Sequence, residues 1–332
     1  MFRSTILQAG MLAIVACTAS ADPVKLRMGW VLTPPELPPV LFEEPGIAKH
    51  LGTSYIYEPF HFTSSSLIVT ALATGDIDIS PLTVFTVAAA IQNAKIEDLR
   101  ILADEFQDGV DGYFSQEFMV RKDSGIARIE DLKGKVFGSI GIGRIGDIAV
   151  RVLLRRHGLS DKRDYSVVEA QSANLVPMLA AGKVDLIAAQ GIFYFDPYLQ
   201  SIAKPLFTQK DAYGTTQASV FVSRVGFLAK NRPAVVDFFE DMLRAVHWYT
   251  DPANRTRAAQ IIARFTKLPP ERFEPWIFTH DDLYRDPNGL PDLDALQRTF
   301  GIERDAGLLK EDIDAKAFAD LSIIREAAAR LK

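Results

Sequence analysis

Two segments of the sequence follow one pattern at a constant distance of 107 residues. Each has a serine at the start, an apolar stretch with helical spacing, a glycine, and a short apolar run that ends the unit. Such a pattern predicts a capped helix, a glycine stop and a strand. It indicates either a duplicated unit or two unrelated helix-to-strand junctions. The aligned pairs are Ser65 with Ser172, Ile68 with Leu175, Leu72 with Leu179, Gly75 with Gly182, Ile77 with Val184 and Asp78 with Asp185.

The residues before each copy favour duplication, because a strand pattern and a glycine-bearing loop precede both: 24–28 and then 135–140. Strands that alternate with helices predict an α/β fold with mainly parallel sheets flanked by helices, and 332 residues suffice for two such lobes. We expect two crossings between the lobes, which are natural hinges. The expected parts are a first part of lobe one at 22–116, lobe two at 117–217, and a return to lobe one with C-terminal helices at 218–332.

Composition argues for binding and against several kinds of chemistry. The net charge of −5 without a basic block disfavours nucleic acid as a partner. A single cysteine excludes a disulfide framework, and the five histidines show no metal-ligand spacing. The sequence also lacks a Gly-x-Ser-x-Gly nucleophile motif. We therefore expect no enzyme activity, no cofactor and no metal.

Residues 1–21 have the features of a secretory signal peptide. Arg3 is basic, 6–16 are apolar but too few to span a bilayer, and Ala19-Ser20-Ala21 suits cleavage. Cys17 offers a competing interpretation, a lipid-anchored protein acylated at that cysteine. A buried helix of the fold is a third one. Cleavage after Ala21 predicts an exported chain that begins at Asp22.

The glycine-rich string Gly141-Ile142-Gly143-Arg144-Ile145-Gly146 follows a predicted strand and precedes a predicted helix at 147–157. This G-x-G-x-x-G pattern fits a dinucleotide site, with Glu169 as the ribose acid. Its place in the second lobe, before only one more short β-unit, argues against that interpretation. A loop whose backbone N–H groups bind an anion, and a tight turn without a ligand, both remain open.

Ligands of open α/β sheets bind beyond the carboxyl ends of the strands, which selects the loops after each predicted strand. There the serines can donate hydrogen bonds to an acidic head group or simply cap a helix, Arg144 can supply a counter-charge or be a solvated surface arginine, and the aromatic residues can form pocket walls or core. His280-Asp281-Asp282 fits an acid/base cluster, a metal-ligand set or a solvated loop. The candidate ligand-binding residues are Trp30, Phe62, Ser64, Ser65, Ser66, Pro81, Thr83, Gly141, Gly143, Arg144, Gln171, Gln190, Phe193 and Phe195.

Several strings resemble the periplasmic solute-binding proteins of ABC importers in the nitrate, sulfonate and taurine group, whose fold thiamine-pyrimidine synthesis proteins share. The resemblance covers about 24–248, and it implies a two-lobed Venus-flytrap that encloses a small molecule. It also implies a periplasmic monomer that delivers a small organic ligand to an ABC permease in the inner membrane. The strings are Leu26-Arg27-Met28-Gly29-Trp30, 71–78, 129–136, 179–185 and Asp196-Pro197-Tyr198.

Two loops depart from the pattern of that family. The first loop, 32–39, is proline-rich and carries Glu36, and Phe195-Asp196-Pro197-Tyr198 stands where relatives have a Trp-Glu-Pro-Tyr-like stretch. We expect a sulfonate or aromatic carboxylate to be captured by domain closure. Glu36 leaves an amine or a pyrimidine open, and a pyrimidine-synthesis enzyme on the same scaffold or a sensor partner are the rival functions.

Overall fold

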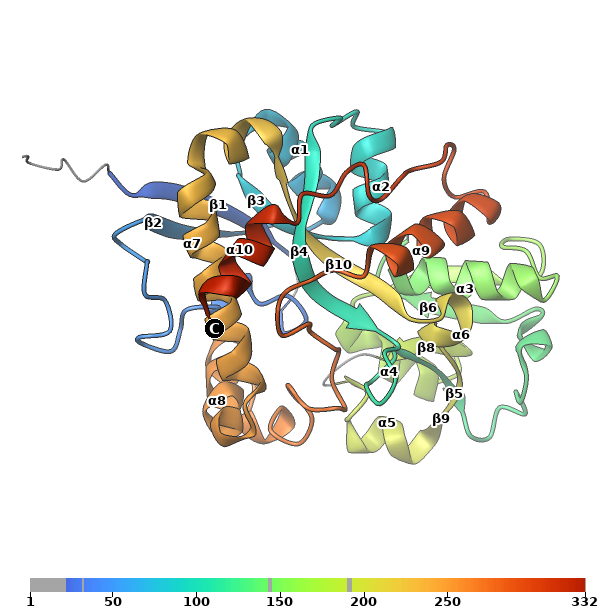
Figure 1. Ribbon diagram of the computed structural model, residues 1–332. Helices are drawn as coiled ribbons and strands as arrows, with labels where there is room; N and C mark the ends of the chain where they lie inside the picture. The colour runs from blue at the N-terminus through green and yellow to red at the C-terminus, as the bar shows by residue number, and fades with distance from the viewer. Residues whose placement is uncertain (1–21, 32, 143–144, 190–192, 332) are drawn as a thin grey trace, which may run out of the picture.

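The computed structural model describes residues 22–31, 33–142, 145–189 and 193–331. The chain folds into two lobes, each with a five-stranded sheet flanked by helices (Figure 1). This arrangement confirms the α/β, two-lobed fold predicted from the sequence. The predicted signal peptide at 1–21, with Cys17, lies outside the described residues.

The first sheet has the strand order β2-β1-β3-β10-β4. Strand β1 pairs in parallel with β2 and β3, and β10 is antiparallel to β3 and β4. Four strands thus share one direction and only β10 is reversed, as the prediction of a mainly parallel sheet requires. The strands are β1 (Val24–Trp30), β2 (Tyr55–His61), β3 (Ile79–Thr83), β4 (Leu99–Asp108) and β10 (Thr216–Arg224).

The second sheet repeats the first in its design, with the order β7-β6-β8-β5-β9. Strand β6 is parallel to β7 and β8, and β5 is antiparallel to β8 and β9. The reversed strand of each sheet directly follows a chain crossing between the lobes, since β5 comes after β4 and β10 after β9 and α6. The strands are β5 (Glu117–Arg121), β6 (Val136–Ser139), β7 (Ser166–Glu169), β8 (Leu186–Ala189) and β9 (Ala203–Thr208).

The repeated unit makes the same pair of hydrogen bonds in both sheets, which accounts for their similar strand order. In the first copy the N–H of Arg27 donates to Asp78 Oδ2 (2.9 Å), and the N–H of Asp78 donates back to the carbonyl of Arg27 (2.8 Å). In the second copy Val136 and Asp185 exchange the same two bonds, at 3.0 and 2.8 Å. Each aspartate therefore fastens the central strand, which follows the helix (β3 or β8), to its parallel neighbour (β1 or β6), which accounts for aspartate at that place in both copies.

Ten α-helices are described, and they cover the faces of both sheets. Helices α7, α8 and α10 pack on one face of the first sheet, while α1, α2 and α9 pack on the other. Helices α3 and α6 cover one face of the second sheet, and α4 with the residues around α5 covers the other. The helices are α1 (Ser65–Thr74), α2 (Val84–Gln92), α3 (Ile145–Arg156), α4 (Ser172–Ala180), α5 (Pro197–Ile202), α6 (Gln209–Tyr213), α7 (Val225–Thr250), α8 (Arg255–Thr266), α9 (Leu293–Asp305) and α10 (Ser322–Arg330).

Helix α7 is longer than the sequence predicts. The pattern predicts a helix from Pro233, whereas the structure begins α7 at Val225 and interrupts it at Asn231, whose φ of −126° is not helical. A proline cannot donate a backbone hydrogen bond and restricts the residue before it, so the kink falls just ahead of Pro233. In the described part of the chain, no helix combines the length and the apolar character needed to cross a membrane.

Candidate ligand-binding site

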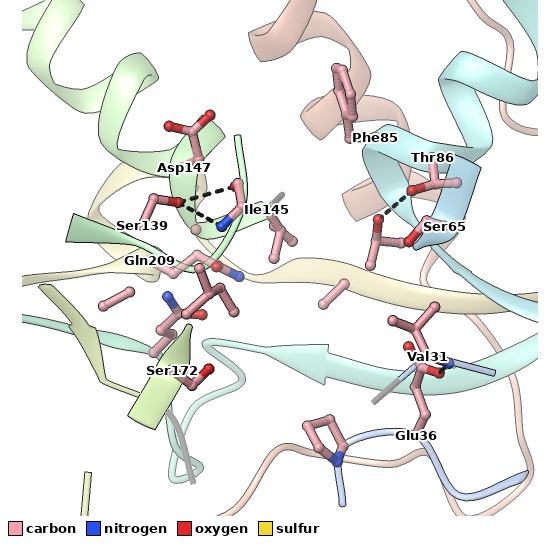
Figure 2. A pocket seen from close by; sticks show the side chains of 18 of the residues that line it. Val31, Glu36, Ser65, Phe85, Thr86, Ser139, Ile145, Asp147, Ser172 and Gln209 are labelled. Atoms are coloured by element: carbon pink, nitrogen blue, oxygen red, sulfur yellow. Dashed lines mark hydrogen bonds between the residues drawn. The ribbon is translucent and has the colours of Figure 1, made fainter. Parts of the chain in front are cut away.

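A cavity of about 720 Å³ lies between the two lobes. Its walls come from the loop after β1, the starts of α1 and α2, the starts of α3 and α4, the first crossing and a C-terminal loop at 281–283. This volume falls within the range usual for small-molecule sites. Figure 2 shows side chains from both lobes around the same space.

Four helices begin at the cavity, two from each lobe. Ser64 and Thr83, the N-cap residues of α1 and α2, line it, and so do Ile145 and Ser172, the first residues of α3 and α4. Helix N-termini carry a partial positive charge and orphan backbone N–H groups, so both lobes direct this charge toward the cavity.

The hydroxyl groups at these helix starts bond to one another instead of capping the helices. Ser64 Oγ lies 2.9 Å from Ser66 Oγ, and Thr83 Oγ1 lies 2.9 Å from Thr86 Oγ1. Neither Ser64 nor Thr83 makes a side-chain capping bond. The first-turn N–H groups of α1 and α2 therefore lack a side-chain acceptor from the N-cap residue, which leaves them suited to an acceptor on a ligand.

The glycine-rich string has a packing role that the structure makes visible. A Cβ atom on Gly146 would lie 2.7 Å from Nε2 of Gln116, so only glycine lets that side chain reach the start of α3. Before it, Ser139 Oγ accepts the N–H of Gly141 (3.1 Å), and Glu169 Oε2 accepts the N–H of Ile142 (3.2 Å). Glu169 thus binds the loop itself, where the dinucleotide interpretation would have it bind a ribose.

Six carboxylic acids line the cavity, and the described lining residues include no lysine, arginine or histidine. Most of these acids are already held by protein donors. Asp147 pairs with Arg151 at 2.9 Å, and Glu36 Oε2 accepts the N–H of Val31 at 2.6 Å. Asp108, Glu169 and Asp282 each accept a backbone N–H. Among the described residues, none donates to the carboxylate of Asp281. The acids are Glu36, Asp108, Asp147, Glu169, Asp281 and Asp282.

Asp282 is buried in the C-terminal loop, where burial raises the pKa of its carboxyl group. Its Oδ2 accepts the N–H of Phe278 (2.9 Å) and its Oδ1 accepts the N–H of Leu283 (2.8 Å). These bonds shape the loop that closes this side of the cavity.

Asp108 lies where both chain crossings meet. It ends β4, pairs with Thr216 at the start of β10, and accepts the hydroxyl of Ser115 (2.6 Å) and the N–H of Gln116 (2.9 Å). Burial raises the pKa of Asp108 to about 6, and the two hydrogen bonds oppose that rise. The residue therefore ties the first crossing to the second at the cavity wall.

Aromatic side chains form much of the remaining wall. Phe195 stacks on Trp276 with ring centroids 5.4 Å apart and planes 6° from parallel, which brings a loop of lobe two against lobe one. Rings in such a wall favour a ligand with an apolar or aromatic body. The aromatic residues of the wall are Phe85, Phe106, Phe114, Phe137, Phe193 and Trp276.

The predicted site residues divide into three groups. Those at the starts of helices and in two loops line the cavity: Ser64, Ser65, Ser66, Thr83, Gly141 and Phe193. Gly143, Arg144 and Gln190 lie outside the described residues. The others do not line the cavity: Trp30, Phe62, Pro81, Gln171 and Phe195.

Local geometry explains the third group. Strand alternation puts Trp30 on the face of Leu26 and Met28, where its ring lies 5.4 Å from that of Phe265 in α8. Pro81 is paired inside the sheet, opposite Phe221. The other three also have different surroundings: Phe62 packs on the core around α1 and α2, Gln171 is the exposed N-cap of α4, and Phe195 lies behind Trp276.

Sequence reasoning did not select several lining residues that come from the crossings and the C-terminal part. These are Phe106, Asp108, Phe114, Gln116, Gln209 and Trp276. The signal available for four of them was the expected crossover loop at 107–116 and its neighbours. Asp281 and Asp282 belong to the cluster that the sequence singled out, and the structure places both at the cavity.

A group of potential metal ligands lies apart from the cavity, at His50, Asp237 and Glu240. His50 Nε2 is 3.3 Å from Glu240 Oε2, while Arg330 Nη1 is 2.7 Å from Asp237 Oδ1 and 3.6 Å from Glu240 Oε2. The guanidinium already occupies the place where a cation would balance both acids. This donor set therefore has the chemistry of an ion-pair network.

Two sheets of this topology with a cavity between them define the two-lobed fold of periplasmic binding proteins. The sequence matches the model of the NMT1-like family over residues 19–263, so the chain belongs to that family. A comparison with curated proteins gives no match.

Solved structures share the fold over nearly the whole chain. The alkanesulfonate-binding protein SsuA of Xanthomonas axonopodis pv. citri, bound to MOPS, is 21% identical with a TM-score of 0.68, and the match covers 91% of this chain and all of that one. The nitrate-binding protein NrtA of Synechocystis PCC 6803 is 15% identical with a TM-score of 0.71, covering 93% and 89%. The desulfurization enzyme DSZB is 16% identical with a TM-score of 0.63, covering 93% and 100%. At these identities the likeness establishes the fold, which binding proteins and an enzyme both use.

Proposed function

We propose that this protein is an extracytoplasmic solute-binding protein that captures a small organic anion, a sulfonate or an aromatic carboxylate, for an ABC importer. The observation that carries the proposal is the convergence of four helix N-termini, two from each lobe, on one cavity of about 720 Å³. Backbone N–H groups and helix dipoles stabilise an anion without a lysine or arginine. The predicted counter-charge Arg144 remains part of this proposal.

Capture is proposed to proceed by closure of the lobes around the ligand. Contacts between the lobes support this mechanism: Asp196 of lobe two pairs with Arg272 at 3.1 Å, beside the stack of Phe195 on Trp276. A ligand that touches helix starts in both lobes stabilises the closed state. Moving a population from mostly open to mostly closed takes about 5.5 kcal/mol of differential affinity.

We further propose a periplasmic location for the protein and an ABC permease as its partner. Removal of the 1–21 leader places the mature chain in the periplasm, with acylation at Cys17 as the rival form. There the protein works as a monomer with an ABC permease and has no enzymatic activity. The proposed lobes comprise 22–116 with 218–332, and 117–217.

A second candidate ligand is an amine or a pyrimidine, and the acidic lining favours it. Six carboxylic acids without a lysine, arginine or histidine among the described lining residues would suit a ligand rich in hydrogen-bond donors. An enzyme on this scaffold is the further alternative, because DSZB shares the fold.

The proposal is tested by thermal unfolding of residues 22–332 with sulfonates, carboxylates, nitrate, amines and pyrimidines, followed by calorimetry on each compound that responds. A ligand at 100 times its dissociation constant adds about 2.7 kcal/mol of stability. We expect aromatic sulfonates or carboxylates to respond. A response to amines or pyrimidines alone would replace the anion by the second candidate.

Variants of the helix starts connect such a response to the cavity. The double change Ser64→Ala and Thr83→Ala is expected to weaken the responding anion about tenfold, since it removes two hydroxyl groups at the cavity. Arg144→Ala is expected to weaken it by about 2 kcal/mol. Thr70→Ala is the matched control, because this hydroxyl bonds Ser66 O on the exposed side of α1.

A further inference from the structure

One polar side chain of the cavity wall has a buried oxygen atom to which no described residue donates a hydrogen bond. Gln209 is the first residue of α6, directly after β9, and is only 1% exposed while it lines the cavity. Its Oε1 atom has no hydrogen-bond partner among the residues that the structure describes. Figure 2 shows the side chain between Ser139 and Ser172 of the second lobe.

The position of Gln209 is fixed by the hinge. Its backbone N–H donates to the carbonyl of Gln116 (2.8 Å), and the N–H of Gln116 donates to Asp108 (2.9 Å). Gln116 is itself 3% exposed and packs against the start of α3 at Gly146. The carboxamide of Gln209 is therefore held at the junction of the first crossing, α6 and the cavity.

A buried acceptor without a donor destabilises the folded protein. Such a group in a core would be replaced by an apolar one, whereas in a cavity wall a ligand can satisfy it. A site built to hydrogen-bond an O–H or N–H group also rejects an analogue that lacks the group. Gln209 can therefore discriminate between ligands that carry a hydrogen-bond donor and ligands that lack one.

We propose that Gln209 is a specificity-determining residue whose Oε1 accepts a hydrogen bond from an N–H or O–H group of the ligand. The inference rests on the proposed function and narrows it, because the cargo is then an aromatic acid that also carries an amino or hydroxyl group. The acidic head lies at the helix starts, and the donor group lies toward the hinge. The carboxylic acids of the lining would also favour a hydrogen-bond donor on the part of the ligand that faces the hinge.

Matched pairs of compounds test this inference by calorimetry. Benzenesulfonate is compared with 3- and 4-aminobenzenesulfonate, and benzoate with 3- and 4-hydroxybenzoate. In the unaltered protein we expect at least one donor-bearing isomer to bind about tenfold more tightly than its parent. Gln209→Met should bring this ratio to about one, because the parent then no longer leaves a buried acceptor without a donor, while Gln209→Glu, which keeps an acceptor oxygen, should retain a preference for the donor.

The control is Gln200→Met, which changes an exposed glutamine of α5 outside the cavity and should keep the ratio of the unaltered protein. Equal binding of parents and donor-bearing isomers, or a preference that survives Gln209→Met, would overturn the role of Gln209 and leave the proposed function standing. Silence of every acid would contradict the proposed function and the inference together. Where the methionine variant does not fold, equal binding of parents and donor-bearing isomers by the unaltered protein still overturns the inference.

Discussion

The two lobes share one strand order but differ in how firmly the shared unit is fastened. In lobe one Asp78 accepts the N–H of Arg27 and also the guanidinium of Arg27, whose Nε and Nη2 lie 2.9 and 2.7 Å away. In lobe two Asp185 accepts the N–H of Val136, while its nearest cation, Lys135 Nζ, is 3.8 Å away. At equivalent positions, Asp78 thus forms a bidentate ion pair with Arg27, while Asp185 makes only a longer contact with Lys135.

The lobes also differ in what covers their outer faces. The first sheet has a large core under α7, α8 and α10, to which the chain returns after lobe two. The corresponding face of the second sheet is covered by α3 and α6, with a smaller set of buried side chains. The C-terminal helices α7, α8 and α10 therefore enlarge the core of lobe one, while α9 also contacts the core of lobe two.

The largest effect expected from this comparison is the loss of the Asp78 clamp. Asp78→Ala should lower the free energy of unfolding by about 3 kcal/mol, because its buried carboxylate accepts three hydrogen bonds from Arg27, one from the N–H and two from a guanidinium on a side chain that is 34% exposed. Asp185→Ala should cost about 1 kcal/mol, since its cation is more distant. Denaturant unfolding measures both, and equal losses would contradict the difference between the clamps.

A second effect concerns the contact between the lobes at α9. Glu303 of α9 is buried beside Tyr213 of α6, whose hydroxyl lies 3.5 Å from Oε1, and burial raises the pKa of Glu303 to about 8. Between pH 4.5 and 8 the folded protein holds a proton there that the unfolded chain releases. The free energy of unfolding should therefore fall as the pH rises through this window.

Glu303→Gln removes that titration and should leave a shallower fall between pH 5 and 8, with a gain of about 2 kcal/mol at pH 8. Thermal or denaturant unfolding at several pH values measures the slope. Burial raises the pKa values of Asp104 and Asp108 to about 7 and about 6, so part of the fall should persist in the variant. Identical slopes for the two proteins would show that Glu303 does not titrate at this contact.

The smallest effect is expected at the partly exposed ion pair of Arg272 with Asp196 between the lobes. Arg272→Ala should change the free energy of unfolding by less than about 1 kcal/mol, because surface pairs contribute little. It should nevertheless shift the ligand-free protein toward the open state by up to about threefold, which distances between labels on the two lobes would measure. Arg257→Ala breaks a similar pair with Glu44 inside lobe one, and a matching shift in that variant would refute the role of Arg272.

The fold could be predicted because its unit is local. Gly75 and Gly182 both have positive φ values at the ends of α1 and α4, and the strand that follows each is short and apolar. The serines at the start of α1 could be predicted to line the site, because parallel strands bring the loops that follow them to one edge of the sheet. Each of these signals lies within about ten residues of sequence.

The rest of the site depends on contacts that no local pattern contains. Gln209 reaches the cavity because α6 starts at the hinge, and Trp276 reaches it from a part of the chain that follows β10. Trp30 lies at the end of the correct strand, but the alternation of side chains turns it toward α8. Long-range placement and the direction of single side chains therefore decided which candidates line the cavity.

The insertion of β10 between β3 and β4 has a consequence for the order in which the protein can be completed. All five strands of the second sheet lie within 117–208, whereas the first sheet lacks its fourth strand until residues 216–224 exist. A chain that emerges from its N-terminus can thus finish the second sheet while the first still has an open gap between two strands. The lobe that begins the sequence is the last to close its sheet, and its folding awaits contacts between residues far apart in the chain.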